Sequence, residues 1–131
     1  MKKFICLLLS VMLISVPLTG FSAVDDISLS AVFQNYKGET LTTIKNVNYA
    51  DVIVKIENKK TAAKNITVVI ALYKNNEILR LVKAKNTNFK PGASKTYKTG
   101  MPIPKDKTGL KLRTYVLDEN NLNISGEMVL Q

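Results

Sequence analysis

The chain contains no histidine, no tryptophan and only one cysteine, Cys6. The absence of histidine excludes a Ser-His-Asp triad and the usual zinc sites, and one cysteine so near the N-terminus leaves no thiolate nucleophile in the body of the chain. The stability of the fold must therefore come from packing rather than from disulfides. Only carboxylate chemistry, a Ser-Lys pair or oxygen-ligated calcium survives these exclusions. We expect a protein that is not an enzyme and that uses no cofactor.

The N-terminal segment has the pattern of a secretory signal peptide. Two lysines follow the initiator methionine, and Phe4 to Leu18 is almost wholly apolar. Gly20 and Ser22 then put small residues at positions −3 and −1 of a cleavage after Ser22. The alternative is an uncleaved anchor, but the apolar run falls short of the roughly 20 residues that span a bilayer. We therefore expect residues 1–22 to be removed, and residues 23–131 to be secreted or held at the cell wall without membrane contact.

Residues 23–131 have the length of a single domain with a basic composition. The full chain carries 19 lysine and arginine residues against 10 acidic residues, a net charge of +9. A positive field of this size favours anionic partners such as cell-wall polymers or acidic polysaccharide. The lysines are scattered rather than clustered, so solubility alone is the competing interpretation. We expect no nucleic-acid partner.

Short segments of alternating apolar and polar residues predict an all-β chain with little helix. The two asparagines of the turn at 74–77 tolerate the positive φ that a tight hairpin demands. Prolines 102 and 104 bracket a crossing loop. A threonine-rich segment at 41–47 is a weaker candidate for continuing the first strand. The expected strands are 27–33, 51–57, 66–73, 78–85, 95–99, 110–117 and 122–130. Their number and spacing predict a single antiparallel two-sheet β-sandwich.

Three stretches carry a resemblance to a known family: ADVIVKIENKKTAAKNITVVIALYKNNEIL, FKPGASKTYKTGMPIP and GLKLRTYVLDENN. Together they resemble the fibronectin-III-like or immunoglobulin-like β-sandwich modules of secreted Gram-positive bacterial proteins. The likeness covers residues 27 to about 121 and rests on architecture rather than on active residues. Many of those modules have a tryptophan where this chain has Leu117, and residues 121–131 continue as a further strand.

A short acidic turn, Asp118 to Asn123, has oxygen donors at the first, third and sixth positions, as a calcium loop does. Leu122 stands where the fifth donor belongs, and no helix is expected after the loop. An ordinary polar turn is the simpler interpretation. We therefore expect no metal site.

The segments 66–73 and 110–117 carry apolar residues on both faces. If their even-numbered residues point inward, the odd-numbered residues point outward. Should the two strands be neighbours, as the resemblance implies, the outer face holds a platform made of Tyr73, Lys111, Arg113 and Tyr115, with Val69 and Leu117 beside them. An aromatic and cationic platform can stack sugar rings or hold a polyanion. The competing interpretations are that another segment covers this face, or that the two faces are exchanged.

These features favour a non-enzymatic extracellular binding or structural module that adheres to anionic cell-wall or polysaccharide material. The alternative is a small secreted protein of the protease-inhibitor kind. It would present a loop, 74–77 or 101–104, to another secreted protein, since proline-rich loops are already stiffened for binding.

Overall fold

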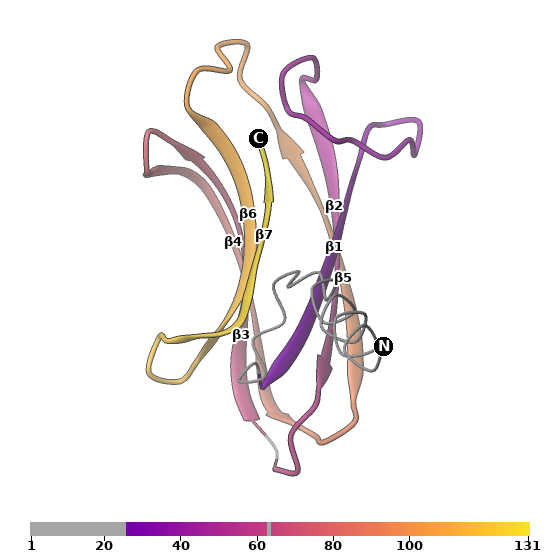
Figure 1. Ribbon diagram of the computed structural model, residues 1–131, viewed down its shortest axis with the longest axis vertical. Coiled ribbons are helices and arrows are strands. Elements are labelled where there is room, and N and C mark those ends of the chain that lie inside the picture. The colour runs from indigo at the N-terminus through magenta and orange to yellow at the C-terminus, as the bar shows by residue number, and fades with distance from the viewer. Residues whose placement is uncertain (1–25, 63) are drawn as a thin grey trace, which may run out of the picture.

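The computed structural model describes residues 26–62 and 64–131, and the predicted signal peptide lies outside these residues. The described residues form seven β-strands and no helix (Figure 1). Within this part of the chain there is accordingly no helix long and apolar enough to cross a membrane. The strands are β1 (Ile27–Gln34), β2 (Tyr49–Asn58), β3 (Lys64–Lys74), β4 (Glu77–Phe89), β5 (Ser94–Pro102), β6 (Leu110–Asp118) and β7 (Asn123–Leu130).

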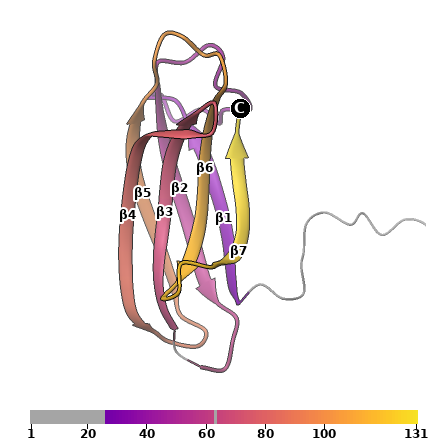
Figure 2. The same ribbon diagram turned by 90° about the vertical axis from the view of Figure 1, so that its left-hand side faces the viewer.

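The strands make two antiparallel sheets that face each other (Figures 1 and 2). One sheet has three strands in the order β1-β2-β5, and the other has four in the order β4-β3-β6-β7. Only β3 and β4, and β6 and β7, are chain neighbours within the four-stranded sheet. The chain therefore crosses between the sheets after β2, after β4 and after β5. The predicted all-β, two-sheet architecture is confirmed.

The core lies between the sheets and follows from period-two alternation. On β2, Val52, Val54 and Ile56 are fully buried while the residues between them are not. On β6, Leu112 and Val116 are buried in the same way, and the core cluster draws on both sheets. Burying each such side chain stabilises the fold by about 1.5–3 kcal/mol relative to leaving it exposed.

The segment at 41–47 is a loop and not the continuation of β1 that the sequence predicted. Leu41, Ile44 and Val47 are spaced by three residues, so they cannot line one face of a strand. They instead close the end of the core: Ile44 is buried, and its N–H donates to the Gln131 carbonyl at 3.3 Å. A turn around Gly38, whose φ is +82°, lets the chain reverse before this loop.

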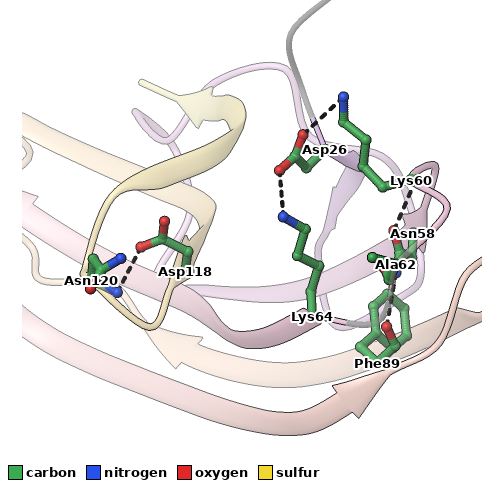
Figure 3. Close-up of polar contacts among 8 residues, drawn as sticks. All are labelled: Asp26, Asn58, Lys60, Ala62, Lys64, Phe89, Asp118 and Asn120. Atoms are coloured by element: carbon green, nitrogen blue, oxygen red, sulfur yellow. Dashed lines mark hydrogen bonds and ion pairs between the residues drawn. The ribbon is translucent and has the colours of Figure 1, made fainter.

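A buried asparagine joins the two sheets at their other end (Figure 3). Asn58, the last residue of β2, donates from its amide to the Phe89 carbonyl at 2.8 Å and to the Ala62 carbonyl at 3.0 Å. Its side-chain oxygen accepts the Lys60 N–H at 3.0 Å. Phe89 ends β4 in the opposite sheet, so this one side chain ties both layers to the turn after β2.

Candidate functional site

The outer face of the four-stranded sheet carries the residues that the sequence singled out. β3 and β6 are neighbours, and the even-numbered residues of 66–72 and 110–116 are buried. The predicted parity of both strands is therefore confirmed, and Tyr73, Lys111, Arg113 and Tyr115 share the outer face. All four side chains are half-buried.

Two tyrosines and an arginine form one connected group on this face. The Tyr73 and Tyr115 hydroxyl groups lie 2.9 Å apart and share a hydrogen bond. The guanidinium carbon of Arg113 lies 4.9 Å from the centroid of the Tyr73 ring, within the range of a cation–π contact. The three side chains hold one another in place. They offer a fixed aromatic surface that does not have to be ordered when a ligand binds.

The hydroxyl of Tyr115 stays protonated at every physiological pH. Burial is the main cause, and the hydrogen bond to Tyr73 adds to it; together with the nearby Glu127 carboxylate they raise the pKa of Tyr115 to about 12. The positive charge of Arg113 acts in the opposite direction but is a smaller influence. Tyr115 can therefore act only as a neutral hydrogen-bonding and stacking group.

Arg113 is less available to an outside anion than the sequence suggested. Its Nε lies 3.6 Å from the Glu127 carboxylate of β7, and its side chain is only 26% exposed. The guanidinium is thus placed between an aromatic ring and a carboxylate of the same sheet. Its role in this geometry is to support the Tyr73 ring, and the free positive charge of the face must come from other residues.

Val69, which was expected beside the platform, and its outward neighbour Ala71 are both covered. Both point to the outer face, yet Val69 is only 1% exposed and Ala71 is fully buried. In the antiparallel ladders Val69 lies between Lys83 and Tyr115, and Ala71 lies between Leu81 and Arg113. These small residues sit between long side chains of both neighbouring strands. They form the floor of the face rather than part of its contact surface.

Lys83 and Lys85 supply the free charge that the sequence interpretation missed. Both belong to β4, lie level with Val69 and Thr67 on the outer face, and are exposed. No ion pair of either lysine is formed among the described residues. Their period-two spacing after Leu81 was visible in the sequence, but their face could be assigned only once β4 was known to pair with β3.

The two outer faces of the molecule differ in charge. On the four-stranded sheet the outward residues include four cations, Lys83, Lys85, Lys111 and Arg113, against the single carboxylate of Glu127. On the three-stranded sheet the outward charges balance. They are those of Lys55, Lys98, Asp51 and Glu57, with Lys98 and Asp51 3.5 Å apart. The positive charge on the sandwich faces is therefore concentrated on the side that carries the tyrosine pair.

In the acidic turn after β6, the Asp118 carboxylate is bound by backbone N–H groups of the same turn. One carboxylate oxygen of Asp118 accepts the N–H groups of Asn120 and Leu122 at 2.8 and 2.9 Å (Figure 3 shows the first). This is the geometry of an ordinary Asx turn. No group of three acidic side chains that could hold a metal ion is found in residues 26–62 and 64–131.

Of the two loops considered for inhibition, one is partly buried. Met101 and Ile103 are 2% and 5% exposed and belong to the core, so only Pro102, which is exposed, and Pro104, which is half-buried, reach the surface from the 101–104 loop. The turn at Asn75 and Asn76 is exposed, with φ of 50° and 68° as the hairpin prediction required. The Asn75 N–H donates to the Gly109 carbonyl at 3.1 Å, which fastens the turn to the loop before β6.

Comparison with known proteins identifies no family. No family model matches the chain, and no curated protein matches it. Among solved structures it is similar to a protein from Bordetella pertussis described as ApaA, at 17% identity over 80% of this chain and 92% of that one, with a TM-score of 0.47. Chicken MD-1, complexed with lipid IVa, matches at 8% identity over 79% and 88% of the two chains, with a TM-score of 0.34. Beta-glucosidase 3B from Thermotoga neapolitana, in complex with alpha-D-glucose, matches at 12% identity over 79% of this chain and 17% of its own, with a TM-score of 0.37.

Proposed function

We propose that the domain is a sandwich of the fibronectin-III-like or immunoglobulin-like kind found in secreted Gram-positive bacterial proteins. The strand order supports this proposal. In immunoglobulin constant domains the first, second and fifth strands share a sheet, and the third, sixth and seventh strands form the other. The same division holds here, with β4 added beside β3 rather than beside the three-stranded sheet.

The function that the geometry supports best is non-enzymatic binding of an anionic polymer, such as cell-wall material or acidic polysaccharide, by a secreted domain. The observation that carries it is the concentration of unbalanced lysines beside a fixed tyrosine pair on one face. Lys83, Lys85 and Lys111 attract the charge of the polymer, and the rings of Tyr73 and Tyr115 supply stacking area for sugar rings. An anionic polymer lying along this face meets both kinds of contact at once.

The test compares charge reversal on the two outer faces. The double variant Lys83→Glu with Lys85→Glu should weaken binding to immobilised dextran sulfate by about tenfold or more, because attraction becomes repulsion at two exposed positions. The matched control is Lys55→Glu with Lys98→Glu. It changes the net charge by the same amount on the balanced face and should change binding much less. Uncharged dextran measures whatever binding comes from the sugar alone.

The comparison of the two double variants distinguishes binding at the outer face of the four-stranded sheet from attraction by the net charge of the whole domain. Equal loss in both double variants would mean that only the net charge matters, and the outer-face site would be wrong. Binding should also weaken as salt rises from low to physiological concentration, where the Debye length shortens to about 8 Å.

A further inference from the structure

The free edge of β4 differs from the other sheet edges of the molecule. Within β4 four large apolar side chains are exposed: Ile78 at 49%, Leu79 at 48%, Leu81 at 44% and Val82 at 37%. Among the strands that the structure describes, β4 is the outermost of its sheet, so its outer backbone groups have no partner in those strands. A long edge strand that exposes apolar residues on both faces is a template for pairing with another strand.

The remaining edge strands expose fewer large apolar side chains: none on β5, Val32 on β1, and Met128 and Val129 on β7. β5, the edge of the other sheet on the same side of the sandwich, exposes Ser94, Lys95, Thr96 and Lys98 and ends at Pro102. Proline at an edge discourages strand addition, and β5 offers a partner strand no exposed large apolar side chain. β1 and β7 lie against each other across the two sheets. β7 does expose Met128 and Val129, but its pairing with β6 shifts register near Gly126, whose φ is +74°.

The backbone of β4 is regular enough to accept a neighbour. Its ladder with β3 shifts register at Leu79, and from Arg80 to Asn86 the pairing is unbroken. The free edge of that stretch therefore presents an uninterrupted series of backbone donors and acceptors.

The charges along β4 select what can pair with it. The strand begins with the acidic Glu77, continues through the apolar residues around Arg80, and then carries Lys83 and Lys85. A second copy running antiparallel sets the acidic end of each strand beside the basic end of the other. A parallel copy would set lysine against lysine, which is destabilising.

We propose that two copies of this chain associate through antiparallel pairing of β4 with β4, joining their four-stranded sheets into one continuous sheet. The contact is isologous. It uses the free β4 edge of both copies, so assembly stops at the dimer. The proposal does not depend on the proposed polymer binding.

The two ideas respond to salt in opposite directions. Each copy is strongly basic, so the two copies repel at long range, and screening by salt should strengthen the dimer. Polymer binding should weaken under the same change. The association constant measured over a series of salt concentrations without any polymer therefore depends on dimer formation alone.

The experiment is sedimentation velocity on the protein as recovered from an expressing culture, with its N-terminus read by mass spectrometry. The concentration runs from about 5 µM to about 500 µM, which brackets weak specific association. We expect the weight-average sedimentation coefficient to rise from the monomer to the dimer value and to go no higher. A monomer at every concentration, or growth beyond the dimer, would overturn the proposal.

Two variants with the same added charge locate the contact. Leu81 lies in the regular stretch of β4, so Leu81→Lys adds one cation from each copy to the paired strands and should lower the association constant by about tenfold or more. Thr96→Lys adds the same charge to the exposed edge of β5 and should change the association constant by less than about threefold. Both positions are exposed, so both variants should keep the wild-type denaturation midpoint. An equal effect of the two variants would show that the contact does not lie on β4.

Discussion

The side chain of Asn58 offers a demanding test of how the two sheets are held together. Replacing it by alanine removes three hydrogen bonds and leaves two carbonyl oxygens, of Ala62 and Phe89, without their donor. Asn58 is only 1% exposed, so water cannot easily replace the lost amide. Each group left unpaired in a buried place costs about 1–3 kcal/mol. We expect Asn58→Ala to lower the free energy of unfolding by about 2–4 kcal/mol, a large share of the stability of a small domain.

An aspartate at the same position should behave differently with pH. Asn58→Asp keeps the shape of the side chain but turns a carboxylate towards the Phe89 and Ala62 carbonyl oxygens. Burial and the facing oxygens disfavour the charged form and should raise its pKa in the folded state above its ordinary value of about 3.9. A raised folded pKa stabilises the protein at low pH, and this contribution is lost as the pH rises through that pKa. The variant should therefore lose stability, relative to the wild type, between about pH 4 and about pH 7.

Urea denaturation at several pH values measures both effects, with Asn35→Ala as the matched control. Asn35 also makes three side-chain hydrogen bonds, to Glu39 and Lys37, but at the surface. Water can replace them, so its loss should cost less than about 1 kcal/mol. If Asn58→Ala cost no more than Asn35→Ala, the buried amide would not be what joins the sheets. A stability difference between Asn58→Asp and wild type that does not change with pH would refute the electrostatic part of the argument.

Three further changes test other features of the fold. Thr114 is fully buried, and its hydroxyl has no hydrogen-bond partner in residues 26–62 and 64–131. Thr114→Val should therefore raise the unfolding free energy by about 1 kcal/mol and the melting temperature by several degrees; a lower melting temperature would contradict this. A Cβ at Gly100 would collide with the Tyr49 hydroxyl, so Gly100→Ala should displace the Tyr49 ring. We expect a change in tyrosine absorbance or fluorescence and a loss of unfolding free energy of about 1 kcal/mol or less. An unchanged spectrum would count against the contact. The Lys64 ammonium, 3.0 Å from the Asp26 carboxylate, is the main cause that lowers the pKa of Asp26. Asp26→Asn should therefore be less stable than wild type at neutral pH. The unfolding free energies of the two proteins should converge as the pH falls below about 4.

The strands were predictable because the alternation of apolar residues within each strand shows which of its faces is buried. β2 and β6 alternate strictly, and the residues expected to point inward, such as Val54 and Leu112, are the buried ones. The hairpin turn at Asn75 was predictable for an equally local reason, since few residues other than glycine accept a positive φ. The loop around Ile44 was not predictable in the same way. Its apolar residues are held by the end of a core that forms only when both sheets are present.

The candidate site was only half predictable, because it depends on which strands are neighbours. Tyr73 and Tyr115 were found together because both β3 and β6 carry apolar residues on two faces, a sign that both faces are covered or used. Nothing local to Lys83 distinguishes it from the lysines of the balanced face. Its importance comes from lying level with Val69, whose burial between Lys83 and Tyr115 shows how closely the long side chains of this face meet. The contribution of Arg113 changes for the same reason: the pairing of β6 with β7 brings Glu127 beside it. A charge therefore gains or loses its availability to a ligand through the strand next to it, and the pairing of distant strands is the information that a single sequence does not contain.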